Sequence, residues 1–142
     1  MFENSKMMQT NYLLEKSLDV ESLRRKVIAN NIANVDVPHF KRSEVNFESE
    51  LQRAIREAND SSNLLPAKLT NKKHIPFYVP RDIMSVQSRI NLDYNSTYRN
   101  DGNNVDIEKE VVDAAKNLMR YNAMTTRLNS NFKMLKLVMR TI

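Results

Sequence analysis

A heptad repeat in the last third of the chain constrains the fold more than any other feature. Mostly apolar residues recur there at alternating spacings of four and three, at Ile107, Val111, Ala114, Leu118, Tyr121, Thr125, Leu128, Phe132, Leu135, Met139 and Ile142. This period places the side chains in one stripe along a helix, and such a stripe needs a partner helix. We therefore predict one continuous helix of about 36 residues, which is about 54 Å long at 1.5 Å per residue.

The residues before this repeat predict where the helix begins. Gly102 is expected in a turn, and either Asn104 or Asp106 is expected to cap the helix. Glu108 and Glu110 lie in the first turn, and basic residues follow later. This order of charges suits the helix dipole, so these carboxylates need no catalytic explanation.

A second long helix is predicted near the start of the chain, from about residue 4 to 35. Leu13, Val20, Leu23 and Val27 form its apolar stripe, and no proline or glycine interrupts it. The two long helices are best used as an antiparallel hairpin that brings both ends of the chain together. One such pair leaves apolar surface uncovered, which further copies would cover in a filament or tube.

The residues between the long helices are less regular. Asn46 is expected to begin a short helix, and residues 59–103 read as turns with one or two short strands, at Phe77–Val79 and Arg89–Asn95. The fold class is therefore mainly α, with a small irregular middle segment. The predicted parts are residues 1–58, 59–103 and 104–142, with both ends contributing to one assembly domain.

The residue inventory argues against catalysis. The chain has no cysteine, one glycine and two histidines in unrelated loops. It therefore offers no nucleophile–base pair, phosphate-binding loop or metal-ligand cluster, and we expect no enzymatic activity, cofactor or metal. The net charge of +5 is spread singly along the predicted helices, which favours a solvated face over a nucleic-acid site. No cleaved signal or membrane span is expected either, which by itself suggests the cytosol.

Three asparagines stand at the end of the first predicted helix, in the sequence Ile-Ala-Asn-Asn-Ile-Ala-Asn of residues 28–34. Asparagine is a mediocre helix former because its side chain competes for the backbone. Two interpretations are open. The amides can mark a helix end that approaches Pro38, or they can fix the register between packed helices.

This signature, followed by a proline, an aromatic residue and Lys41, resembles the N-terminal motif of the bacterial flagellar axial family of rod, hook and hook-associated proteins. Residues 40–51 and the run Asp-Gly-Asn-Asn-Val-Asp at 101–106 resemble its proximal rod members in particular. The motif residues carried over are Ala29, Asn30, Asn31, Ala33, Asn34, Pro38 and Phe40. One departure is His39-Phe40 where the family has Gly-Tyr, which suggests that this turn is built differently or needs no positive φ angle.

The resemblance implies a structural component of the flagellar basal-body rod. Such proteins build a hollow axle from their terminal helices, transmit torque and let exported subunits pass. It implies partners in other rod proteins, the MS ring, the rod adapter protein and the export gate. It also implies a periplasmic location reached through the flagellar type III apparatus without a cleaved signal peptide. The alternative from the residues alone is a cytosolic coiled-coil adaptor or chaperone-like dimer.

Overall fold

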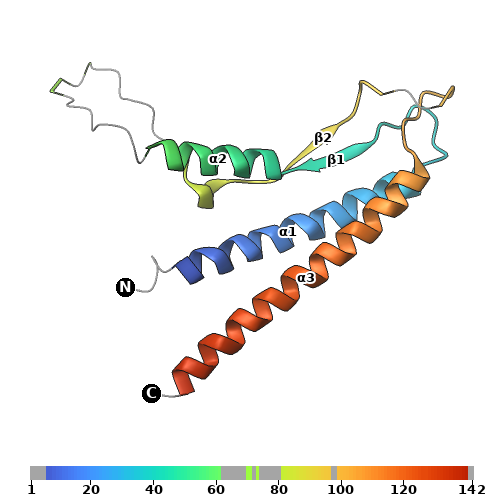
Figure 1. Ribbon diagram of the computed structural model, residues 1–142. Coiled ribbons are helices and arrows are strands. Elements are labelled where there is room, and N and C mark those ends of the chain that lie inside the picture. Colours follow the sequence, from blue (N-terminus) through green and yellow to red (C-terminus); the bar gives the residue numbers. More distant parts are fainter. Residues whose placement is uncertain (1–5, 62–69, 72, 74–80, 97–98, 141–142) are drawn as a thin grey trace. The chain divides into compact units, whose positions relative to one another are not determined.

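The computed structural model describes residues 6–61, 70–71, 73, 81–96 and 99–140 (Figure 1). Its elements in chain order are α1 (Lys6–Ala33), β1 (Ser43–Asn46), α2 (Glu48–Ser61), the short 3-10 helix η1 (Ile83–Ser85), β2 (Arg89–Leu92) and α3 (Ile107–Arg140). They form two compact units, one from residues 1–45 with 90–142 and the other from residues 46–89. The division into 1–58, 59–103 and 104–142 stays a prediction.

The first unit is a hairpin of two long helices. α1 and α3 run antiparallel and pack against each other, so the start of α1 and the end of α3 lie at the same end of the pair (Figure 1). The predicted fold class is confirmed: mainly α, with paired terminal helices and a small middle segment. Val20 and Val27 of the predicted stripe are buried, as is the adjacent Ile28, whereas Leu13 and Leu23 are partly buried.

A two-stranded antiparallel sheet lies at the closed end of the hairpin (Figure 1). The Asp93 N–H donates to the Arg42 carbonyl oxygen at 2.9 Å, which fixes the register of β1 against β2. β2 is the strand predicted over Arg89–Asn95, although it ends at Leu92. β1 was not predicted, and the strand predicted at Phe77–Val79 lies outside the described residues.

The start of α3 agrees with the sequence. Asp106 is the cap, since its Oδ1 accepts from the N–H groups of Glu108 at 3.0 Å and Lys109 at 3.3 Å. These bonds satisfy two of the donors that a helix leaves open at its first turn. Asn104, the other predicted cap, has a different role that is described below.

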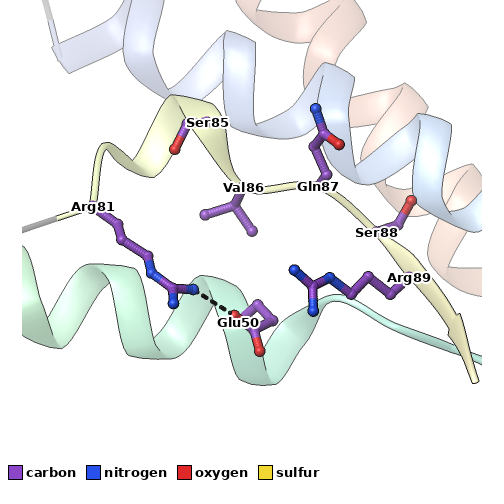
Figure 2. A pocket seen from close by; sticks show the side chains of 7 residues that line it. All are labelled: Glu50, Arg81, Ser85, Val86, Gln87, Ser88 and Arg89. Atoms are coloured by element: carbon purple, nitrogen blue, oxygen red, sulfur yellow. Dashed lines mark hydrogen bonds and ion pairs between the residues drawn. The ribbon is translucent and has the colours of Figure 1, made fainter.

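The second unit holds α2 and η1. Asp82 caps η1 by accepting from the Met84 N–H at 2.9 Å, and Arg81 forms an ion pair with Glu50 of α2 at 3.0 Å. A hollow of about 230 Å³ lies between this pair, Ser85, Val86, Gln87, Ser88 and Arg89 (Figure 2). Glu50 already neutralises Arg81 there, so we assign this hollow no ligand.

Candidate functional site

The closed end of the hairpin is organised around three charged or polar side chains from different segments. Glu110 of α3 is fully buried and accepts from Arg42 Nε at 2.5 Å and from Asn31 Nδ2 at 3.1 Å. Asn31 also binds the edge of β1, because it donates to the Ser43 carbonyl at 2.8 Å and accepts from the Ser43 N–H at 3.0 Å. Asn31 therefore ties α1 to both β1 and α3.

Two asparagines before α3 complete this junction. Asn103 is fully buried, and its Nδ2 donates to the carbonyl oxygens of Asn34, Val35 and Val37 at 2.9–3.1 Å. One side-chain amide thus contacts three carbonyl oxygens at and just after the end of α1, and fastens the segment before α3 to that helix end. Asn104 accepts from the Arg42 N–H at 2.6 Å and donates to the Asp93 carbonyl at 2.6 Å, so its side chain completes the end of the sheet.

Two groups near the junction have shifted pKa values. Burial acts to lower the pKa of Arg42, but hydrogen bonds and charge from Glu110 and Glu44 outweigh it and raise that pKa above its usual value. The hydrogen bonds that Asp93 accepts from the Ser96 hydroxyl and the Asn95 N–H lower the pKa of Asp93. Arg42 therefore stays charged under all ordinary conditions, as its partner Glu110 requires.

The turn after α1 contains the departure from the family motif. His39 has a φ angle of +61°, so the alternative that this turn needs no positive φ angle is wrong. The backbone has the left-handed conformation that glycine favours, and a histidine adopts it here. The His39 ring lies against Gly102, whose own φ angle is +77°. The backbone N–H of His39 donates to the Asp101 carbonyl oxygen at 3.1 Å.

We expect Gly102→Ala to destabilise the protein by about 1–2 kcal/mol from the left-handed backbone alone. A Cβ atom at this position would also lie 2.8 Å from His39 Nδ1, which is too close for an unshifted contact. Chemical denaturation measures the loss. In the background of His39→Gly the same substitution should cost less, because the obstructing ring is gone. An equal cost in both backgrounds would exclude the ring contact.

The structure separates the three asparagines of the signature. Asn31 is fully buried and makes the contacts described above, whereas Asn30 is exposed. Asn34 donates locally to the Asn30 carbonyl at 2.7 Å, which suits a helix end. Of the other motif residues, Ala29, Ala33 and Pro38 are exposed, and Phe40 is partly buried with its N–H bonded to the Val37 carbonyl.

Asn31→Ala and Asn30→Ala form a matched pair of variants. The first removes the amide that binds the Ser43 N–H and one of the two hydrogen bonds that Glu110 accepts, so we expect a loss of about 1–3 kcal/mol. The second removes an exposed amide and should stabilise the helix by up to about 0.7 kcal/mol, since alanine is the better helix former. Urea unfolding compares them. If the two variants unfold at the same urea concentration, Asn31 only marks a helix end and does not fix packing.

Polar pairs also join the two helices along their length. Asn117 Nδ2 donates to Glu21 Oε2 at 2.5 Å and to the Glu21 carbonyl at 2.9 Å. Nearer the open end, Asn131 Nδ2 donates to Asn11 Oδ1 at 2.7 Å. All four side chains are buried, and sequence reasoning missed them because it followed apolar residues. A signal was present, since Glu110, Asn117 and Asn131 lie seven and fourteen residues apart, with Met124 at the position between the last two.

The heptad residues fall into two groups. Ala114, Tyr121, Thr125, Leu128 and Leu135 are partly buried, and Tyr121 contacts α1 through the Arg25 guanidinium, which lies 5.1 Å from the ring centre. The others that are described remain 47–70% exposed: Ile107, Val111, Leu118, Phe132 and Met139. Ile142 lies outside the described residues. We call these five exposed residues the outer face of α3.

Two kinds of site are absent from the described ranges. None of the helices there is long and apolar enough to cross a membrane. The described residues also contain no group of three or more histidine, cysteine, aspartate or glutamate side chains placed to hold a metal ion. The hairpin, its junction and the outer face of α3 are therefore the features that we consider for function.

Comparisons with known proteins agree on one kind of relative. A family profile described as flagella basal body rod protein matches residues 18–41, which span the end of α1 and the following turn. The flagellar basal body rod protein FlgB of Borrelia hermsii is 42% identical, over 90% of this chain and 93% of its own length. The proteins of the same name from Borreliella burgdorferi and Bacillus subtilis are 42% and 33% identical, over 87% and 89% of this chain.

Proposed function

Since this chain belongs to the FlgB family of flagellar basal-body rod proteins, we propose that it assembles with copies of itself through the outer face of α3, as a subunit of the hollow axle. The family establishes a structural component of the basal body that works together with other rod and basal-body proteins. The manner of assembly, the export route and the individual partners are our proposal.

The observation that carries this proposal is the exposure of large apolar side chains along the whole of α3. Val111, Leu118 and Phe132 are each more than half exposed, although they belong to the heptad pattern. Large apolar side chains in a row on one helix face are typical of an interaction surface. Burying one such side chain is worth about 1.5–3 kcal/mol, so several together can hold a subunit in place.

The family also indicates where this assembly takes place. We propose a subunit of the proximal rod in the periplasm, exported by the flagellar type III apparatus without removal of a signal peptide. Its neighbours would be other rod proteins outward and, at the base, the MS ring, the rod adapter protein and the export gate. Asn31 and Asn103 join the closed ends of the two terminal helices, which suits a subunit that is incorporated as one body.

Concentration-dependent assembly of the purified chain tests the proposal. A rod subunit should give monomers together with polydisperse or tubular particles, seen by analytical ultracentrifugation and electron microscopy. The alternative function, a coiled-coil adaptor or chaperone-like dimer, would give a defined small dimer at all concentrations. A stable dimer that does not grow would therefore contradict assembly through the outer face.

A further inference from the structure

The contacts between α1 and α3 include buried polar pairs, at positions where a helix pair is normally apolar. Asn11, Glu21, Asn117 and Asn131 are each less than a tenth exposed, and they bond to one another in two pairs. Such pairs stabilise a buried interface poorly compared with well-packed apolar side chains. The Asn11 pair is a clear case, because Asn11 Nδ2 is buried with no acceptor in the described part of the chain.

We propose that these four side chains form a pairing code that selects a single antiparallel register of α1 against α3. In the observed register, Glu21 faces Asn117 and its charge is compensated by Arg24 at 2.5 Å and Arg120 at 4.0 Å. Buried polar groups are known to fix register and orientation in helix pairs at some cost in stability. The inference concerns pairing within the subunit and does not depend on the proposed function.

Displacements by one heptad show what the code excludes. Such a slip moves α3 by about 10 Å along its axis and keeps the same face toward α1. In one direction Glu110 takes the place of Asn117, so two carboxylates meet, and Met124 comes opposite Asn11. In the other direction Met124 comes opposite Glu21 and Val138 opposite Asn11. Both slips leave a buried polar group facing an apolar side chain, which is unfavourable.

The buried polar side chains also give the two faces of α3 different partners. Two α3 helices that met in parallel through the face now turned to α1 would bring Glu110 against Glu110 of the other copy, and like charges repel. The outer face carries no such restriction, since Leu118 and Phe132 are apolar and exposed. The polar face is thereby reserved for α1, and the outer face remains for contacts between subunits.

A distance measurement in solution tests the code. The chain has no cysteine, so Gln9→Cys and Lys133→Cys, both exposed and near the open end, give one pair of spin-label sites. With the native polar pairs, pulsed electron paramagnetic resonance should give one narrow distribution of distances between the two spin labels. Glu21→Leu/Asn117→Leu should keep its helix content, measured by circular dichroism. Its distance distribution should gain a second, longer population, because a slip of one heptad offsets the two labels by about 10 Å along the helix axis.

Two further variants make the outcome decisive. Ser22→Leu/Lys116→Leu adds two leucines at exposed positions and should keep the single native distance. Glu21→Asn/Asn117→Glu exchanges the two partners and preserves a polar pair, so this variant should also show the single native distance. The proposal is overturned if Glu21→Leu/Asn117→Leu keeps one native distance, if that variant loses its helix content, or if the exchanged pair loses the register. None of these measurements involves assembly of the rod.

Discussion

Phe132→Glu is expected to abolish incorporation of the subunit into the rod while leaving the isolated chain folded. Phe132 lies on the outer face of α3 and is 54% exposed, so the single subunit loses little packing when it is replaced. In the assembled rod the same change removes about 1.5–3 kcal/mol of apolar burial. It also forces a carboxylate into an interface between subunits, which costs more than the lost burial. Motility and the subunit content of purified basal bodies measure the effect.

Lys133→Glu is the matched control for this prediction. It introduces the same side chain one position later, at an exposed site where charges contribute little. We expect normal incorporation, with both variants expressed and exported at similar levels. If the two variants behave alike, the outer face is not the main assembly surface, and the heptad residues of α3 do not mediate assembly.

The largest loss of stability is expected from Arg42→Met. The guanidinium lies against Glu110, which is fully buried, so its removal leaves a buried carboxylate with Asn31 as its remaining bonded partner. Breaking one side of a buried ion pair costs about 3–5 kcal/mol, a large share of the roughly 5–15 kcal/mol that holds a typical domain together. Urea denaturation followed by circular dichroism gives the free energy of unfolding.

Replacing the other member of the ion pair, by Glu110→Gln, should lower the free energy of unfolding by less than Arg42→Met does. Arg42 would still contact Glu44 at 3.0 Å and Asp113 at 3.7 Å, and these acids are more accessible to water. The double variant Arg42→Met/Glu110→Met should recover much of the loss, because no unpaired charge remains in the interior. A double variant as unstable as Arg42→Met alone would show that the junction depends on shape and not on charge.

The long helices were predictable because their signals are local. α3 begins at Ile107 because Asp106 caps it and Gly102 turns the chain before it, and all three residues could be read from the sequence. β1 could not be read in this way. Its four residues have no run of β-branched or aromatic side chains, and they are extended because Asn31 binds their edge and β2 pairs with them from more than forty residues away.

The candidate site was less accessible to sequence reasoning, for a related reason. Apolar periodicity indicates that a helix needs partners, but it cannot say which partner each side of the helix receives. Tyr121 lies against α1 while Phe132 is exposed, although both belong to one heptad series. The face toward α1 is centred instead on Glu110, Asn117 and Asn131, whose pairing depends on residues about eighty or more positions earlier.

The spacing of the polar pairs has a mechanical consequence. Pulling the open ends of α1 and α3 apart loads the pairs one after another, first at Asn131 and then at Asn117, as in the opening of a zipper. Sliding one helix along the other loads both pairs and the bonds of Asn31 and Asn103 at the same time. The hairpin is therefore soft against splaying and stiff against shear. A subunit of this kind can open its tips to fit a neighbour while it resists lengthwise slip under load.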